Sequence, residues 1–307
     1  MSNRIWRIAC TLVLAANLPA ITTVGDPSLY VAATGGIFSG IGEVNSSVGS
    51  CSGSLIADKF VLTAAHCVGA NMSVTFAWAN LSPAYSVTLA VRNPSFGGSS
   101  NPVNDIALLR LASAADPSIP RYGLYSSSDE LGQIITLAGY GYSGQGPYTQ
   151  GYGTLRSGLN QVDGFWDGVT QTAAVNGGPF TLDNLGGDLA FDFDGGAYNY
   201  LGGNAITGAA PRNEAITCFG DSGGPSFAGI VNGVTIPAIL GVHSIIDDVT
   251  GAQPDCGFGN LGGDTRVSAY VGWIRATEAA LTQSPEPGTW LMALAALAGI
   301  WLRRKPA

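Results

Sequence analysis

The chain has 307 residues, of which 46% are hydrophobic and only 11% are charged, and it contains 44 glycines. Its formal net charge is -8 at pH 7, and an acidic chain without a basic patch excludes nucleic acid as an expected partner. The length suits one large domain or two small ones, and the glycine content is typical of a loop-rich β protein.

Residues 1–20 have the pattern of a secretory signal peptide. Arg4 and Arg7 precede an apolar run, and small residues follow as far as Ala20. Such a peptide is removed on export, so we expect cleavage after Ala20. Cys10 leaves with the peptide, and the four remaining cysteines suit two disulfides in an oxidising compartment.

The region from 51 to about 112 alternates short β-branched and aromatic runs with turn clusters, which predicts an antiparallel barrel. In it, VLTAAHCV (61–68) places His66 after an apolar strand, and NDIALLRL (104–111) places Asp105 before the next strand. A lone histidine is usually a packing residue, and a lone aspartate before a strand is usually a turn residue. Neither motif has a function by itself.

A second series of short strands is expected over about 133–245. Within it, residues 176–205 are rich in glycine and aspartate, which predicts a long surface loop. Asp192 and Asp194 alternate around Phe193. Two interpretations of them stay open, a solvated loop and a contribution to a calcium site. We predict no cofactor and assign no metal ligand.

The stretch CFGDSGGPSF (218–227) places Ser222 between an aspartate and two glycines. A serine nucleophile needs a tight turn whose backbone N–H groups point at the reacting carbonyl, and glycines allow such a turn. It also needs a base and an acid that orients the base. Since His66, Asp105 and Ser222 follow one another in three separate motifs, the chance interpretation of each becomes hard to maintain.

LTAAHC, NDIALLRL and GDSGGP together resemble the chymotrypsin/trypsin family of serine proteases, of bacterial type, over roughly residues 50–280. The resemblance implies an all-β fold of two antiparallel six-stranded β-barrels with a C-terminal helix, and an active site in the cleft between the barrels. RVSAYVGWI (266–274) resembles the closing helix. The implied protease domain covers residues 21–283, with its barrels at about 21–125 and 126–283.

The resemblance also implies a role for each site residue. Ser222 attacks the peptide carbonyl, His66 transfers the proton, and Asp105 holds the imidazole. The N–H groups of Gly220 and Ser222 form the oxyanion hole. Ser244 supports Asp105, and the strand after it pairs with substrate. The implied disulfides are Cys51–Cys67 and Cys218–Cys256.

In this family an aspartate next to the serine pairs with the amine of the mature N-terminus, and here that aspartate is Asp221. Cleavage after Ala20 exposes Ile21, a β-branched residue of the kind that the family inserts there. A buried carboxylate requires such a cation. The alternative is that Ile21 is an exposed terminus.

For the substrate pocket, the family's floor position lies at Ile216. With no carboxylate there, cleavage after Lys or Arg is not expected, because the buried cation would lack a partner. Thr217 and His243 match residues that hold the substrate carboxylate in glutamyl endopeptidases. The interpretation that the sequence favours over this one is an apolar pocket, narrowed by Ile246, that takes small or aliphatic side chains.

The functional prediction is a serine endopeptidase that acts on polypeptides. The alternative is a protease-like fold that serves only as a surface binding or adhesion module. An esterase of the α/β-hydrolase type is excluded by motif order, because its serine precedes the acid and the histidine.

Residues 284–307 differ in kind from the rest. A Pro-Glu-Pro is followed by an apolar run from Trp290 to Leu302 and then by three cations. The run is short for a spanning helix, for which about 20 residues are typical, and the cations favour the cytoplasmic side. A buried core helix is the alternative.

This tail resembles the PEP-CTERM sorting signal of Gram-negative bacteria, which implies a sorting peptidase of the exosortase type as a partner. We expect transient membrane anchoring before the tail is removed. The mature protein is then expected in the periplasm, at the cell surface or secreted.

Overall fold

The structure is a computed structural model. It describes residues 21–77, 82–144, 152–168, 170–172, 179–195, 198–203, 205–208, 210, 213–231, 237–248 and 256–283. The expected signal peptide and the expected sorting tail lie outside the described residues. Within the described part of the chain, no helix is long and apolar enough to cross a membrane.

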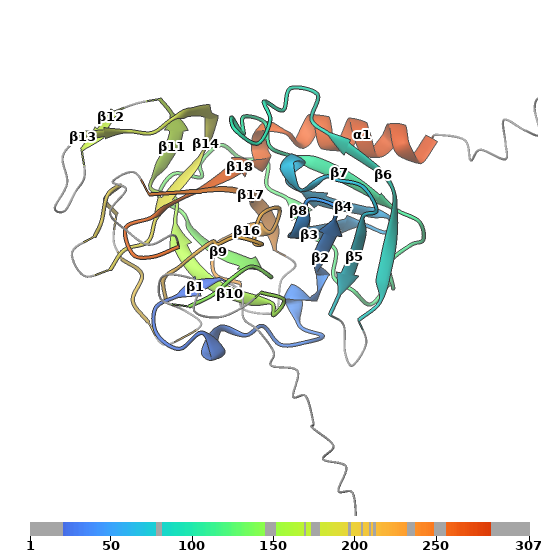
Figure 1. Cartoon of the computed structure of the whole chain (residues 1–307), viewed down its shortest axis with the longest axis horizontal. Helices are drawn as coiled ribbons and strands as arrows, with labels where there is room; N and C mark the ends of the chain where they lie inside the picture. The colour runs from blue at the N-terminus through green and yellow to red at the C-terminus, as the bar shows by residue number, and fades with distance from the viewer. Residues whose placement is uncertain are drawn as a thin grey trace, which may run out of the picture.

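The first half of the chain forms a closed six-stranded barrel, as predicted (Figure 1). Around the barrel the order is β2-β3-β4-β7-β6-β5. Their bounds are Ile41–Ser46 (β2), Gly49–Ala57 (β3), Phe60–Thr63 (β4), Ser73–Phe76 (β5), Ala84–Arg92 (β6) and Ala107–Leu111 (β7). Its interior is filled by fully buried apolar side chains such as Leu55, Val61 and Leu108, since alternate residues of each strand face inward.

The second half forms a larger sheet with the order β10-β9-β16-β17-β18-β14-β11, and β8 pairs in parallel with β17. Their bounds are Gly123–Leu124 (β8), Ile134–Gly139 (β9), Arg156–Gln161 (β10), Gly164–Asp167 (β11), Asn184–Asp192 (β14), Pro225–Ala228 (β16), Ala238–Asp247 (β17) and Leu261–Arg266 (β18). Two short pairs accompany it, β1 (Thr22–Thr23) with β15 (Ala215–Ile216) and β12 (Thr170–Thr172) with β13 (Pro179–Thr181).

This second sheet departs from the expected closed six-stranded barrel. Among the described residues, its end strands β10 and β11 do not pair with each other. The outer edge of β10 pairs instead with two residues outside the sheet. Val31 forms an isolated β-bridge with Arg156, and Glu214 forms one with Leu159. Backbone groups at this edge are therefore satisfied by irregular segments instead of by a closing strand.

The prediction of a long surface loop over 176–205 is wrong in its central part. Residues Asn184–Asp192 form β14, which lies between β11 and β18. Leu189 and Phe191 are fully buried, and Asp192 is only 1% exposed. The glycines and aspartates suggested turns, but the alternate apolar side chains pack into the core and fix a strand.

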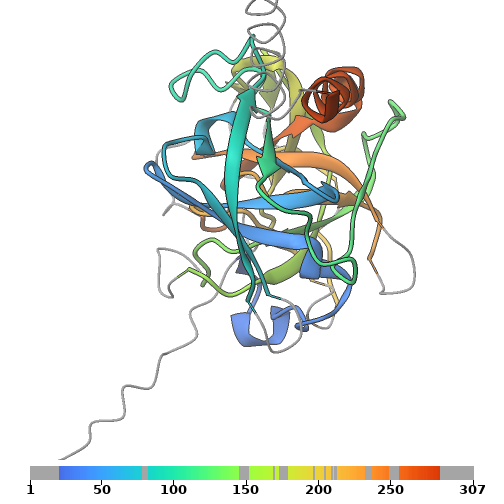
Figure 2. The same ribbon diagram turned by 90° about the vertical axis from the view of Figure 1, so that its right-hand side faces the viewer.

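The C-terminal helix α1 (Val271–Gln283) follows a short 3₁₀ turn at Val267–Ala269. It lies against the closed barrel, and Figure 2 shows it nearly end-on beside that barrel. Val267 and Ile274 are fully buried, and Tyr270 and Val271 pack partly against the same core. The helix thus packs on the outside of the closed barrel.

Candidate active site

The residues predicted as base and acid meet at the junction of the two sheets. His66 lies in the 3₁₀ turn Ala65–Cys67, just after the end of β4. Asp105 lies two residues before Ala107, the first residue of β7. The His66 Nδ1 and Asp105 Oδ2 atoms are 2.5 Å apart, and the His66 backbone N–H donates to Asp105 Oδ1 at 2.8 Å. Asp105 is fully buried, whereas the His66 side chain is 24% exposed. The carboxylate therefore fixes both the imidazole and the turn that carries it.

Asp105 receives a further donor from the second sheet. The Ser244 hydroxyl donates to Asp105 Oδ2 at 2.7 Å. Ser244 lies on β17 at a register shift between His243 and Ile245, and such a bulge re-aims a side chain. The irregularity in β17 thus turns Ser244 towards the carboxylate, as the family resemblance implied.

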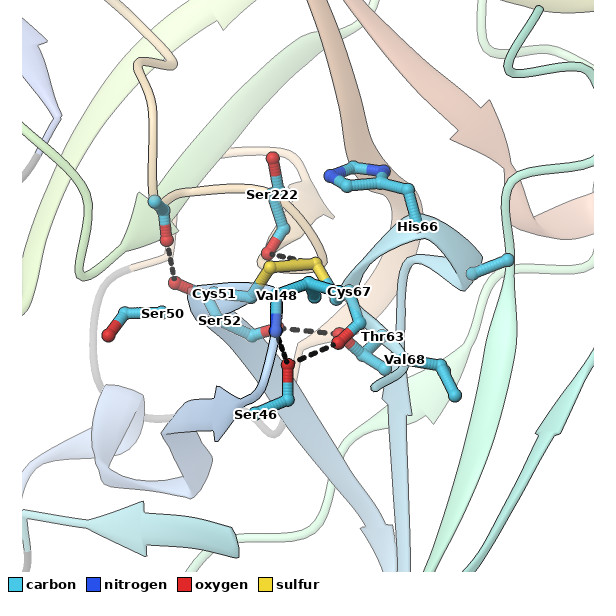
Figure 3. The surroundings of a disulfide bond; sticks show 12 residues. Ser46, Val48, Ser50, Cys51, Ser52, Thr63, His66, Cys67, Val68 and Ser222 are labelled. Carbon is cyan, nitrogen blue, oxygen red and sulfur yellow. Dashed lines mark hydrogen bonds between the residues drawn. A yellow bond between two sulfur atoms is a disulfide. The ribbon is translucent and has the colours of Figure 1, made fainter. Parts of the chain in front are cut away.

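Ser222 lies on the loop between β15 and β16, beside the Cys51–Cys67 disulfide (Figure 3). Its side chain and the His66 imidazole line the same cavity, and Figure 3 shows the two next to each other. The Ser52 N–H donates to the Ser222 carbonyl at 2.8 Å. The serine loop is therefore held against β3, the strand to which the disulfide ties the turn of His66.

The glycines around Ser222 are required by geometry. Gly220 has φ +93°, and a Cβ there would lie 2.9 Å from Gly141 Cα. Gly223 has φ +80°, and a Cβ there would lie 2.1 Å from Thr63 Oγ1. Both backbones occupy the left-handed region that favours glycine. A turn of this kind is what the predicted oxyanion hole requires, because its donors, the N–H groups of Gly220 and Ser222, have to be held in fixed positions.

Ser52 was not predicted, although it has a supporting role. Its hydroxyl donates to the Gly220 carbonyl at 3.0 Å and accepts from the Tyr140 N–H at 3.0 Å. A serine next to a cysteine carries no sequence signal for such a contact. The two hydrogen bonds of the Ser52 hydroxyl fix the peptide plane next to the predicted oxyanion hole.

Asp221 points away from the cleft into the core and is fully buried. Its carboxylate accepts from the N–H groups of Gly141 and Cys218, each at 2.8 Å, and from that of Ile21. Burial raises the Asp221 pKa to about 6, while the charge of His243 and these donors act to lower it. Ile21 is fully buried beside it, so the alternative of an exposed Ile21 does not agree with the structure.

The cleft beside the serine is a cavity of about 230 Å³. Its lining is His66, Thr217, Cys218, Phe219, Ser222, His243, Ser244, Ile245 and Ile246. Four predicted pocket residues are therefore brought together: Thr217, His243, Ser244 and Ile246. Ile216 is not, because it is fully buried in the core of the second sheet with Ile21. The prediction of Ile216 as the pocket floor is corrected by this placement.

His243 is held from behind by two residues that the sequence did not indicate. Its Nδ1 lies 2.9 Å from Asp264 Oδ1, and the Ser226 hydroxyl donates to Asp264 Oδ2. His243 and Asp264 face each other across β17 and β18, and both side chains are almost fully buried. The His243 Nε2 atom has no hydrogen-bond partner among the described residues.

Glu214 is a further acid close to the pocket in sequence. Its carboxylate accepts from the N–H groups of Asp194 and Ile206, at 2.6 and 2.7 Å. It is 2% exposed and does not line the cavity. The pocket of this protein therefore has no carboxylate among its described lining residues.

Cys218–Cys256 is the second disulfide, and both predicted pairings are confirmed. It joins the segment that precedes Ser222 to the loop before β18. Because Cys218 also lines the cavity, this bond fixes one wall of the cleft.

Comparison with known proteins agrees with this geometry. A family model described as Trypsin matches residues 38–171. Cathepsin G of Mus musculus is 35% identical over 102 residues, which are 30% of this chain and 39% of that protein. Granzyme M of Homo sapiens is 27% identical over 235 residues, which are 73% of this chain and 78% of that protein. Brachyurin of Leptuca pugilator is 28% identical over 235 residues, which are 73% of this chain and 86% of that protein.

Among solved structures, neuropsin, described as a serine protease expressed in the limbic system of mouse brain, is similar with a TM-score of 0.57. The two share 18% sequence identity over 81% of this chain and 98% of that chain. At this identity the likeness concerns the fold. Together, the family model and the curated relatives support a trypsin-family serine protease domain with serine-type endopeptidase activity, and the fold of neuropsin agrees with them.

Proposed function

We propose that this serine-type endopeptidase is exported and hydrolyses polypeptides through an acyl-enzyme on Ser222. The catalytic residues of the proposal are His66, Asp105 and Ser222. The observation that carries it is the contact of His66 with a fully buried Asp105, next to Ser222 at the same cavity.

In the proposed reaction His66 Nε2 takes the proton of the Ser222 hydroxyl while the oxygen attacks the peptide carbonyl. The N–H groups of Gly220 and Ser222 donate to the oxygen that becomes negative. His66 then gives its proton to the leaving amine, and the acyl-enzyme forms. Water, activated by the same imidazole, releases the acid and restores the serine. Asp105 keeps its charge and holds the imidazole throughout.

The competing proposal is a catalytically silent binding module. A fluorophosphonate probe separates the two, because only an activated serine reacts with it. We expect labelling of the wild type, none of Ser222→Ala, and strongly reduced labelling of His66→Ala. Replacing the nucleophile costs on the order of a millionfold in turnover in subtilisin, which uses the same chemistry. Equal labelling of wild type and Ser222→Ala would refute Ser222 as the nucleophile.

For specificity, we favour an acidic residue before the cleaved bond over an apolar one. A histidine whose Nδ1 is held by a carboxylate can carry a proton on Nε2 and donate it to an anionic ligand. The unpartnered Nε2 of His243, at a cavity that Thr217 also lines, supports this choice. Ile245 and Ile246 are the apolar walls on which the competing specificity depends.

We further propose the processing scheme that the sequence suggests. Residues 1–20 are removed on export, 21–283 form the protease, and 284–307 are a PEP-CTERM-like signal that anchors the chain until a sorting peptidase of the exosortase type cuts it. The exported site would be the periplasm, surface or surroundings of a Gram-negative cell. The two disulfides support export, because such bonds persist in oxidising compartments.

A host that has the sorting enzyme tests the tail. Replacing Pro285, Glu286 and Pro287 by alanine is expected to leave uncut precursor in the membrane. A chain that ends at Gln283 is expected to be exported and active. Equal processing of the substituted and the natural tail would contradict this part of the proposal.

A further inference from the structure

A buried acid that the proposed reaction does not use is linked to Asp105 through one side chain. Asp188 lies on β14 and is 2% exposed, and Thr265 lies on β18 and is fully buried. The two strands pair with Leu189 opposite Asp264. Asp188 and Thr265, one residue further along each antiparallel strand, therefore also lie opposite each other.

Thr265 connects this acid to the backbone of Asp105. Its hydroxyl donates to the Asp105 carbonyl at 3.1 Å. Thr265 Oγ1 also lies 3.5 Å from Asp188 Oδ2. The Asp105 carboxylate is held by His66 and Ser244, as described above, whereas Thr265 holds its carbonyl. Asp188 is thus in indirect contact with the acid of the proposed triad.

The backbone at Asp105 depends on such support from outside. The Ile106 N–H donates to the Asn104 carbonyl at 2.9 Å, so Asp105 is the middle residue of a three-residue turn. Asn104 has φ +60°, and its side chain accepts from the Tyr270 hydroxyl at 2.8 Å. A shift of the Asp105 carbonyl would move this turn and, with it, the carboxylate that orients His66.

The number of hydrogens in these contacts depends on the protonation of Asp188. A threonine hydroxyl has one hydrogen, and a backbone carbonyl can only accept. While Thr265 donates to Asp105, it can bond to Asp188 only if Asp188 carries a proton and donates it. An ionised Asp188 instead accepts, and hydrogen bonds to charged acceptors are roughly twice as strong as neutral ones. Ionisation would therefore turn the Thr265 O–H away from Asp105.

The surroundings of Asp188 favour its protonated form. The titratable groups that face it come from three elements: Asp105, Asp264 and Tyr270. Arg266 contributes its backbone N–H, while its guanidinium pairs with Glu130. No ion pair of the described residues gives Asp188 a cationic partner, and a buried carboxylate without one is costly. Burial, with repulsion from Asp105 and Asp264, raises the pKa of Asp188 to about 8.

We propose that Asp188 is a positioning residue of the active site, which in its protonated form keeps the Thr265 hydroxyl on the Asp105 carbonyl. This inference rests on the proposed function, because the role of Asp105 belongs to that mechanism. When Asp188 loses its proton, the Thr265 hydroxyl turns to the new carboxylate and the Asp105 carbonyl loses its donor. The activation of Ser222 is then expected to weaken as the pH rises through the Asp188 pKa.

The test measures the rate constant of Ser222 labelling by a fluorophosphonate probe between about pH 6 and pH 9.5, because only an activated serine reacts. Above about pH 8 the wild-type rate constant should fall about three- to tenfold, which corresponds to one hydrogen bond. Asp188→Asn introduces an amide that donates to Thr265 at every pH, so this fall should be absent. A fall that has another origin, such as loss of the Ile21 ammonium proton, is common to both proteins and cancels in the comparison.

Two further variants separate positioning from packing. Thr265→Val keeps the shape but removes the hydroxyl, so its rate constant should already be low at pH 7, and Thr265→Ser should restore it. Asp58→Asn, at a side chain that is 78% exposed, is the matched control and should keep the wild-type pH profile. A purely structural role of Asp188 would change the unfolding temperature of Asp188→Asn but leave the shape of its pH profile unchanged.

Parallel pH profiles for wild type and Asp188→Asn would overturn the proposal, as would a Thr265→Val protein that is labelled at the wild-type rate at pH 7. If thermal unfolding shows that Thr265→Val does not fold, the comparison with Asp188→Asn decides. A wild-type protein that is not labelled at any pH refutes the proposed function and this inference together. Normal labelling with parallel profiles refutes this inference alone.

Discussion

The backbone N–H of Ile21 donates to the carboxylate of Asp221, so the expected mature N-terminus already lies beside the acid that adjoins the serine. Ile21 is held there because its side chain is buried with Ile135 and Leu137, and because its carbonyl accepts from the Ser143 hydroxyl. In the uncut chain this N–H is a neutral amide. Cleavage after Ala20 would turn it into an ammonium group.

This relationship predicts that cleavage stabilises the enzyme above pH 6. The Asp221 pKa is raised from 3.8 to about 6 by burial, so the uncut chain loses stability as the pH rises from about 4 through 6. An adjacent ammonium lowers that pKa and removes the loss. We expect a chain with Ala20 retained to unfold at lower urea concentration at pH 7 and to be less active. N-terminal sequencing of active enzyme should give Ile21, and any other start contradicts the prediction.

The close packing around Gly220 predicts that a side chain at this position lowers kcat. Gly220→Val places a Cβ 2.9 Å from Gly141 Cα in a left-handed backbone, which should displace the N–H groups of the hole. Losing one donor of such a hole costs about 10²–10³ in kcat. Gly132→Val is the matched control, because Gly132 has φ +77° with nothing within 4 Å of a Cβ. Equal kcat values for the two variants would contradict the assignment.

The pocket lining predicts cleavage after glutamate. We expect this preference to depend on His243 and on Asp264, which contacts the His243 imidazole. Matched peptides with Ala, Leu, Phe, Glu and Arg before the cleaved bond should show the highest kcat/KM for Glu and almost none for Arg. His243→Ala should abolish the preference for Glu. Asp264→Asn keeps the shape but removes the charge behind the imidazole, so it should raise KM for Glu peptides more than for Leu peptides. Efficient Arg cleavage, or a Glu preference that survives His243→Ala, would rule this pocket out.

The buried carboxyl group of Asp188 predicts that the stability of the fold depends on pH. It is 2% exposed, and burial, with added repulsion from Asp105 and Asp264, raises its pKa to about 8. The unfolded chain releases this proton near pH 3.8, so the stabilisation is complete below about pH 4 and is lost as the pH rises through about 8. Asp188→Asn cannot ionise and should flatten urea unfolding midpoints between pH 5 and 9. Wild-type and variant profiles that run parallel in EDTA would show that Asp188 does not carry this charge.

The features that lie within short contiguous motifs could be predicted before the structure was known. His66, Asp105 and Ser222 each lie in a contiguous stretch whose residue types are required locally: glycines where the backbone turns left-handed, and small apolar residues where the strand is buried. The disulfide partners followed from the same resemblance, and both agree with the structure.

The contacts between side chains of different strands could not be predicted in the same way. Asp264 supports His243 because β17 and β18 pair in one register, and a shift by one residue would send either side chain to the other face. Glu214 accepts from the Asp194 N–H because two separate segments converge there. Ile216 lies in the core and not in the pocket, because its strand β15 pairs with β1. Such contacts depend on strand register and on burial by distant segments, which no local pattern of residues contains.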